Sequence, residues 1–218
     1  MSPTPSRSRR AALRSRERDL HRRGYRRIAG ADEAGAGPLA GPLVAAAVIL
    51  PPGARLPGVD DSKRLRPAER ERWAERIRQV AVAWAVVPVP AAEVDEVGPL
   101  EAARRGLARA VAALAPGPDY VLVDARRLPG LAVPQEAVIG GDGKHLAIAA
   151  ASILAKTWRD ARMRELDALY PGYGFARHKG YGTREHLAAL RRLGPCPEHR
   201  RRYRPVREAL GVQPGLFR

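Results

Sequence analysis

Residues 28–50 read IAGADEAGAGPLAGPLVAAAVIL and place two adjacent carboxylates between an apolar segment and a glycine-rich turn. The residues before Asp32 and the run 43–50 are apolar, partly β-branched and bounded by glycine and proline, which predicts two buried strands joined by a tight connection. Asp32 and Glu33 then lie at the end of the first strand. Because an unpaired buried carboxylate is costly, the pair indicates either a structural salt bridge or a metal site.

The charge of the chain is its most unusual bulk property. Among 218 residues, 39 lysines and arginines face 23 acidic residues, which gives a formal net charge of +16. This excess favours a polyanionic partner such as nucleic acid, although a basic protein can also be merely soluble. Cys196 is the only cysteine, so an intramolecular disulfide and a cysteine-based metal cage are excluded, which fits a cytoplasmic location. No apolar run is long enough to span a bilayer, so we expect no membrane association.

The first 27 residues are expected to be separate from the rest of the fold. They contain ten arginines and only two acidic residues, with serine and proline at the start. Such a composition predicts a disordered arm or a transient helix, which could hold nucleic acid or act as an organelle transit peptide; we favour a solvated tail. We therefore expect a basic arm over residues 1–27 and a single domain over residues 28–218.

Three apolar segments each lead to an acidic residue. Besides the segment that ends at Asp32, residues 120–124 read YVLVD, and the predicted strand 137–141 is followed directly by Asp142. A single strand-end aspartate is more often a turn former or a helix cap. In sheets covered by helices, however, sites gather at such strand ends. Together with Glu33, the three aspartates favour a metal site.

The remaining pattern is mostly helical. Apolar spacing predicts helices over residues 67–79, from about Pro99 to 114, over 146–169 and over 183–193, and alternation predicts a third strand over 81–89. Residues 171–182 read PGYGFARHKGYG, which is basic, aromatic and broken by glycine. This stretch is either an ordinary loop or a nucleic-acid surface, on which rings stack on sugars or bases and cations hold phosphates.

Several of these motifs, in this order, resemble those of the ribonuclease HII family (type 2 ribonuclease H). The matching stretches are the Asp32-Glu33 strand with its glycine turn, Asp61-Ser62-Lys63, residues 140–160 and the tyrosine loop, and the resemblance runs from about residue 28 to 210. It implies an α/β, ribonuclease H-like fold: a mixed five-stranded sheet, helices on both faces and a C-terminal helical portion that helps form the substrate groove. The implied activity is an endonuclease that hydrolyses the RNA strand of RNA–DNA hybrids and ribonucleotides embedded in duplex DNA. The products would carry 5′-phosphate and 3′-hydroxyl ends.

The resemblance also implies roles for individual residues. The catalytic and metal-binding carboxylates, which would hold Mg²⁺ or Mn²⁺, are Asp32, Glu33, Asp124 and Asp142. The implied substrate contacts are Gly35, Ala36, Gly37, Ser62, Lys63, Lys144, His178, Lys179 and Tyr181. The ring of Tyr181 would pack against the sugar at the RNA–DNA junction. We expect the protein to act as a monomer.

One position of the glycine turn departs from the family pattern. Ala36 stands where the family usually has arginine, between Gly35 and Gly37. Either Arg126 supplies the missing charge, or junction recognition is weakened, and we expect the second. Other departures are Ala125-Arg126 in place of the frequent Gly-Asn, Gly98 in place of asparagine and Arg202 in place of serine.

Two other functions remain possible on the sequence. A catalytically silent nucleic-acid-binding protein would keep the basic surface without turnover. A dinucleotide-binding oxidoreductase is suggested by the glycines after the first strand, but residues 43–50 read as a strand where that motif requires a helix.

Overall fold

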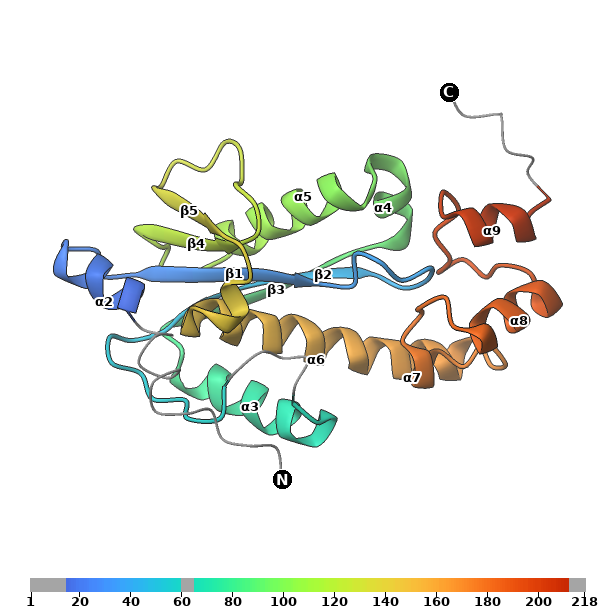
Figure 1. The fold of residues 1–218 in the computed structure, drawn as a ribbon, viewed down its shortest axis with the longest axis horizontal. Helices are drawn as coiled ribbons and strands as arrows, with labels where there is room; N and C mark the ends of the chain where they lie inside the picture. The colour runs from blue at the N-terminus through green and yellow to red at the C-terminus, as the bar shows by residue number, and fades with distance from the viewer. Residues whose placement is uncertain (1–14, 60–64, 212–218) are drawn as a thin grey trace.

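The computed structural model describes residues 15–59 and 65–211 and is built around one mixed sheet of five strands (Figure 1). The strand order is β3-β2-β1-β4-β5, with β1–β2 and β2–β3 antiparallel and β1–β4 and β4–β5 parallel. The strands are β1 Ile28–Ala34, β2 Leu43–Ile49, β3 Ala83–Val89, β4 Tyr120–Asp124 and β5 Gln135–Val138. The predicted fold class is therefore confirmed.

Helices cover both faces of the sheet (Figure 1). On one face lie α4 (Ala91–Val97) and α5 (Pro99–Ala112), and on the other lie α3 (Pro67–Val80) and α6 (Leu146–Leu169). Strand β2 is buried along its whole length because alternate side chains enter two cores. Val44, Ala46 and Val48 pack in the cluster with α3 and α6, whereas Ala45, Ala47 and Ile49 pack in the cluster with α5.

Helix α6 approaches β1 closely because the residues at the contact are small. A Cβ at Gly30 would lie 2.1 Å from the carbonyl carbon of Ala147, so no larger residue fits there. The predicted bounds of this helix, residues 146–169, agree with the structure. The fixed position of α6 places Ser152 against the end of β1, where it hydrogen-bonds to Asp32.

The C-terminal helices lie together at one end of the molecule, beside the connection between β1 and β2 (Figure 1). They are α7 (Phe175–His178), α8 (Arg184–Leu193) and α9 (Arg204–Ala209). Backbone hydrogen bonds attach residues 39–41 to this portion: Leu39 N–H donates to Gly180 O (2.8 Å) and Gly41 N–H donates to Glu198 O (2.9 Å). We name residues 35–42 the 35–42 turn. The C-terminal portion holds one side of this turn.

The structure moves the boundary that was predicted after Arg27. Residues Ser15–Arg22 form helix α2, and its Leu20 is fully buried in a cluster with Ile28 and Ile148. The Glu17 carboxylate also accepts the N–H of Ala147 (2.9 Å) at the N-terminus of α6, where a negative charge is favourable. A single apolar anchor among many arginines gives no periodic signal, which explains the error. Residues 1–14 lie outside the described part.

Smaller differences concern the ends of elements. Strand β1 continues through Asp32 and Glu33 to Ala34. Both acidic residues therefore still pair with β2, and the strand ends one residue after them. The strand predicted over 137–141 is instead β5, and Asp142 lies in a short 3₁₀ turn, η1 (Gly141–Gly143). Helix α4 precedes the helix predicted from Pro99. In the described residues, no helix has the length and apolar character needed to cross a membrane.

Candidate active site

Asp32 is the most buried carboxylate of the site. It lies on the central strand β1 opposite Ala46 of β2, and its Oδ1 accepts the N–H of Glu33 (2.7 Å). Burial raises the pKa of Asp32 well above its usual range, and the nearby charges of Glu33 and Asp124 raise it further. The Ser152 hydrogen bond acts in the opposite direction. Negative charge is therefore concentrated at this end of β1.

Asp124 reaches the same end of the sheet because β4 runs parallel to β1. Val123 pairs with Ala31, so Asp124 and Asp32 follow at matching positions of neighbouring strands. The Oδ1 atom of Asp124 accepts the N–H of Gly141 (2.7 Å), the residue before Asp142. The structure thus brings three predicted carboxylates together and ties the segment of the fourth to them. We name Asp32, Glu33, Asp124 and Asp142 the acidic edge.

One guanidinium faces the acidic edge. The Nη2 atom of Arg126 lies 2.9 Å from Oε1 of Glu33, and both side chains are largely buried. Between Asp124 and Arg126, Ala125 has a φ of +57°, in the left-handed region that glycine adopts with less strain. This is one of the positions where the family often has glycine. Arg126 therefore lies beside the site, as one of the two explanations for Ala36 requires.

The donor set of the acidic edge fits a divalent cation in its chemistry. Carboxylate oxygens are the ligands that Mg²⁺ and Mn²⁺ prefer, and a cation would relieve the repulsion that raises the pKa of Asp32. In the conformation described for residues 15–59 and 65–211, no three acidic, histidine or cysteine side chains are arranged to hold an ion. In this conformation Glu33 pairs with Arg126.

The glycine turn follows the acidic edge directly. Gly35 has a φ of +93°, and a Cβ there would lie 2.1 Å from Nε of Arg159. Both the backbone conformation and the lack of space for a side chain therefore favour glycine at this position. Gly37 is exposed, and a Cβ there would meet no atom within 4 Å. The methyl group of Ala36 packs against an apolar cluster that includes Leu43 and Tyr203. This turn also excludes a dinucleotide-binding motif, since it leads into strand β2 rather than a helix.

The tyrosine loop lies against the same turn. Tyr181 is 46% exposed, and its ring lies over the Arg159 guanidinium at 5.9 Å. The neighbouring Gly180 carbonyl accepts the Leu39 N–H of the 35–42 turn. An exposed ring held in this way is available to a ligand.

His178 is a correction to the sequence prediction. Its side chain is buried, and both ring nitrogens bind backbone groups: Nδ1 accepts the Gly180 N–H (3.2 Å), and Nε2 donates to Tyr173 O (2.8 Å). Burial lowers the pKa of His178, which favours this neutral form. The ring therefore has no nitrogen left for a phosphate, and its role is to shape the tyrosine loop.

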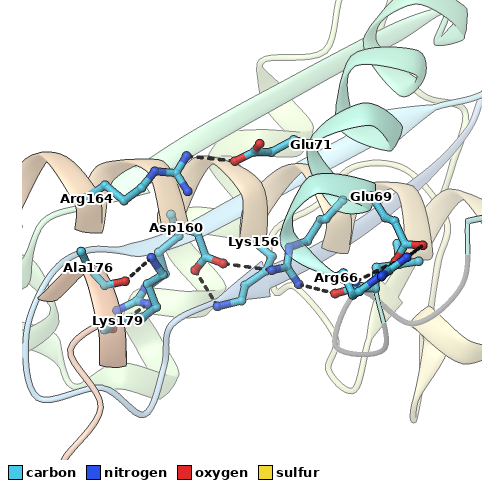
Figure 2. Close-up of polar contacts among 11 residues, drawn as sticks. Arg66, Glu69, Glu71, Lys156, Asp160, Arg164, Ala176 and Lys179 are labelled. Carbon is cyan, nitrogen blue, oxygen red and sulfur yellow. Dashed lines mark hydrogen bonds and ion pairs between the residues drawn. The ribbon is translucent and has the colours of Figure 1, made fainter. Parts of the chain in front are cut away.

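The predicted lysine contacts have different outcomes. Lys179 Nζ donates to the Ala176 carbonyl (2.7 Å), as Figure 2 shows, and Lys144 Nζ donates to Ile139 O (2.7 Å). Lys144 is exposed, whereas Lys179 is partly buried. Neither lysine forms an ion pair within the described residues, so both keep a charge that a phosphate can meet. Ser62 and Lys63 lie outside the described residues.

A polar network joins α3 to α6 on the adjacent face (Figure 2). Asp160 accepts from Lys156 Nζ (2.6 Å) and Arg70 Nη2 (3.2 Å), and Arg164 pairs with Glu71 (3.0 Å). Asp160 lies between two cations, so its charge is compensated. In this network each carboxylate has at least one cationic partner, which is consistent with a structural link between the helices.

Sequence reasoning missed Arg159, Arg200 and Tyr203, whose side chains hold the 35–42 turn. Arg159 donates to Pro42 O (3.0 Å), Ala40 O (3.2 Å) and Lys179 O (3.0 Å). Burial, followed by the charge of Arg200, lowers the pKa of Arg159 to about 10, so it stays charged at neutral pH. The partners of these residues are backbone carbonyls, for which the sequence carries no signal.

Comparisons with known proteins agree with this site. The family profile described as Ribonuclease HII matches residues 29–206. A ribonuclease HII of Geobacillus thermodenitrificans is 60% identical over 197 residues, which cover 90% of this chain and 76% of that protein. The crystal structure of ribonuclease H2 from Pyrococcus horikoshii superposes with a TM-score of 0.72 at 28% identity, covering 84% of this chain and 96% of the other.

A more distant structure supports the fold alone. The Mn²⁺ complex of Bst-RNase HIII is 22% identical, with a TM-score of 0.61, and covers 88% of this chain and 71% of that one. The carboxylates of the acidic edge and the glycine turn thus lie in a fold, and within a matched segment, shared with known ribonucleases. The chain belongs to the ribonuclease HII family, whose members are endoribonucleases that act on the RNA of RNA–DNA hybrids.

Proposed function

We propose that this chain is a metal-dependent endonuclease that cleaves RNA–DNA hybrids and also duplex DNA at embedded ribonucleotides, leaving 5′-phosphate and 3′-hydroxyl ends. The observation that carries the proposal is the gathering of Asp32, Glu33 and Asp124 at one end of the sheet, with Asp142 tied to Asp124 through Gly141. We further propose that the protein acts as a monomer in the cytoplasm.

The acidic edge would hold Mg²⁺ or Mn²⁺. A Mn²⁺ ion occurs in the related structure of Bst-RNase HIII. Bound divalent ions supply an activated water and stabilise the leaving 3′ oxygen of an in-line displacement. The chain's own contribution is a set of hard oxygen ligands on two adjacent strands, backed by α6 through the hydrogen bond from Ser152 to Asp32. Arg126 pairs with Glu33 and balances part of the negative charge of the acidic edge.

Substrate recognition would come from the side of the 35–42 turn. The exposed ring of Tyr181 offers a face for the sugar at the RNA–DNA junction, and Arg159 fixes the ring from below. Lys144 and Lys179 would meet the phosphate backbone. The backbone groups of residues 35–37 would recognise the ribose 2′-hydroxyl, the group that distinguishes RNA from DNA. Because Ala36 has no guanidinium, we propose that this recognition is weaker than in an enzyme with arginine there.

The direct test uses three labelled duplexes of one sequence: all DNA, DNA with a single ribonucleotide, and an RNA–DNA hybrid. We expect cleavage of the second and third only, in Mg²⁺ and not in EDTA. Ligation of the products would confirm their 5′-phosphate and 3′-hydroxyl ends. The Asp124→Asn variant, purified in the same way, controls for a contaminating nuclease. Binding of the duplexes without cleavage would contradict the proposal and support a silent nucleic-acid-binding protein.

A further inference from the structure

A single buried guanidinium holds both carbonyls of the glycine turn. Arg200 is fully buried, and its Nη2 donates to Gly35 O (2.7 Å) while its Nη1 donates to Ala36 O (2.9 Å). Nε and Nη2 also donate to Gly41 O, at 3.1 and 2.9 Å. Arg200 thus joins the first and last parts of the 35–42 turn from one side.

Tyr203 adds a second donor at the same place. Its hydroxyl donates to Ala36 O (2.6 Å), and its ring lies 5.6 Å from the Arg200 guanidinium carbon. The methyl group of Ala36 packs in the apolar cluster that Tyr203 joins. The Ala36 carbonyl therefore has two donors and little freedom to rotate.

The charge of Arg200 is only partly balanced: burial has the larger effect and lowers its pKa, whereas the nearby carboxylate of Asp95 has a smaller, opposite effect. Within residues 15–59 and 65–211, Arg200 forms no ion pair. Isolated buried cations are costly, so its hydrogen bonds to carbonyl dipoles are what make this position tolerable. If a turn carbonyl rotated away, a buried charge would lose a partner, which makes the present orientation of the peptide planes the stable one.

The orientation of the carbonyls fixes the orientation of the N–H groups. Peptide bonds 35–36 and 36–37 are trans, so each N–H points opposite to the carbonyl of the same plane. With both carbonyls directed at Arg200, the N–H groups of Ala36 and Gly37 face the other side. There Gly37 is exposed, and nothing lies within 4 Å of the position its Cβ would occupy. Successive N–H groups on one side form a site for an anionic or hydroxyl oxygen.

We infer that Arg200 and Tyr203 are positioning residues, which orient the peptide planes of Gly35–Gly37 so that two backbone N–H groups face a ribonucleotide. The oxygen recognised would be the 2′-hydroxyl or the adjacent phosphate. The inference rests on the proposed function and assigns specificity to buried side chains that never touch the substrate. It also accounts for how a turn with alanine at position 36 keeps its binding geometry.

The test compares two tyrosine variants that each lose a hydroxyl donating to a backbone carbonyl; the Tyr203 hydroxyl also accepts from Arg200 Nη1 (3.3 Å). Tyr203→Phe removes the hydroxyl that donates to Ala36 O (2.6 Å) but keeps the ring over Arg200. Tyr173→Phe removes a hydroxyl that donates to Gly194 O, also at 2.6 Å, in the same C-terminal portion but away from the turn. Tyr203→Phe should lose at least as much thermal stability as Tyr173→Phe, because it also removes an acceptor of the Arg200 guanidinium. Arg200→Lys is a harsher variant, because an ammonium cannot donate to three carbonyls at once in this geometry.

Two readouts are measured for each protein. The first is kcat/KM on a duplex with a single ribonucleotide, and the second is the ratio of Kd values, without metal, for that duplex and its all-DNA counterpart. We expect Tyr203→Phe to lower kcat/KM by about 2- to 12-fold, as loss of one hydrogen bond implies, and to lower the ribonucleotide preference in Kd. Tyr173→Phe should match the parent in both readouts.

Equal behaviour of Tyr203→Phe and Tyr173→Phe would overturn the inference, as would a parent with no ribonucleotide preference in Kd. A parent that binds the ribonucleotide duplex preferentially but cleaves nothing would contradict the proposed function. In that case the Kd ratios of the two variants would still decide the role of Tyr203.

Discussion

The 35–42 turn follows Asp32 and Glu33 of the acidic edge directly in the chain, yet the two regions differ in the charges that they hold and in how those charges are paired. At the acidic edge, burial and then the charges of Glu33 and Asp124 raise the pKa of Asp32, and the guanidinium of Arg126 pairs with Glu33. In the turn, two buried guanidiniums, Arg159 and Arg200, direct their N–H groups to backbone carbonyls. The carbonyls of the turn accept hydrogen bonds from guanidiniums of the same chain, whereas the acidic edge brings carboxylates of like charge together.

The difference separates the two parts of the proposed function. A region that is satisfied internally is rigid before the substrate arrives, which suits recognition. A region in which several carboxylates lie close together has an affinity for cations. Catalysis should therefore be sensitive to charge at the acidic edge, and selectivity should be sensitive to hydrogen-bond geometry at the turn. The following predictions test this division, from the largest expected effect to the smallest.

Replacing Asp124 should affect activity more than any other change considered. Asp124→Asn keeps the size and the Oδ1 acceptor for Gly141 N–H but removes one ligand charge. We expect cleavage of an RNA–DNA hybrid in Mg²⁺ to fall by about 100-fold or more, the loss typical of removing one electrostatic stabiliser. The melting temperature should hold or rise, because repulsion with Asp32 is relieved. Near-parental cleavage would remove Asp124 from the site.

Truncating Leu20, the buried side chain of α2, should weaken the packing against β1 and β4. The carboxylates of the acidic edge would stay unchanged. Leu20 is fully buried against Ile28 and Leu122, so Leu20→Ala leaves a cavity beside β1 and β4. We expect the free energy of unfolding to fall by about 2–5 kcal/mol in urea titrations. Leu169→Ala, at a leucine that is 62% exposed, is the matched control and should change little. A similar loss in both variants would mean that α2 does not pack as described.

Lowering the pH should reduce the free energy of unfolding through the C-terminal portion, which contacts the 35–42 turn. His178, His186 and His199 pack together in the C-terminal portion, and burial lowers the pKa of each; burial and then the charge of His186 lower that of His199 to about 4. Their pKa in the unfolded chain is about 6.5, so the unfolded state binds more protons as the pH falls below that value. Stability is therefore complete above pH 6.5 and is lost towards pH 4.

Most carboxylates stay ionised between pH 7.5 and 5.5, and comparing the parent with a His199 variant cancels the contribution of groups common to both, such as Asp32 with its raised pKa. By pH 5.5 we expect His199 alone to reduce the free energy of unfolding by about 1 kcal/mol. His199→Asn, which removes the titrating group, should show a flatter dependence in urea titrations at the two pH values. A parent with equal stability at both would contradict the buried, neutral histidine cluster.

Adding a charge to the turn should give the smallest effect. A charge-assisted contact is worth on the order of 1.5–3 kcal/mol, or roughly 10- to 100-fold, if fully expressed in cleavage. Since the Ala36 methyl group already packs on an apolar cluster, we expect only part of this. Ala36→Arg should raise kcat/KM several-fold on a single-ribonucleotide duplex and less on long hybrids, which offer many binding registers.

The matched control for Ala36→Arg is Ala112→Arg, which adds the same charge at an exposed position of α5. An equal gain in both variants would indicate non-specific attraction. If Ala36→Arg gives no gain, the weakened-recognition hypothesis fails, and Arg126→Ala becomes the next variant to test, because Arg126 already lies 2.9 Å from Glu33.

The sequence was sufficient for features that follow from periodicity. Apolar runs predicted strands β1 and β4, which carry Asp32 and Asp124. Helical spacing predicted α6 with its correct bounds. It was insufficient where a side chain bonds to backbone. Nothing marks Arg159 and Arg200 among 35 arginines, because their partners are carbonyls from distant segments. Likewise, His178 reads as a basic loop residue, and only the fold shows that both its nitrogens are occupied.

Mn²⁺ binding tests the central claim, that the acidic edge is one cation site, most directly. Calorimetric titration of the metal alone needs neither substrate nor turnover. We expect the parent to bind Mn²⁺ and Asp124→Asn to bind it at least about ten-fold more weakly, since even residues that merely orient ligands contribute that much. Glu165→Gln, at an exposed carboxylate paired with Arg162 on α6, should bind like the parent. Equal Mn²⁺ affinity in the parent and Asp124→Asn, or no binding by the parent, would contradict the account.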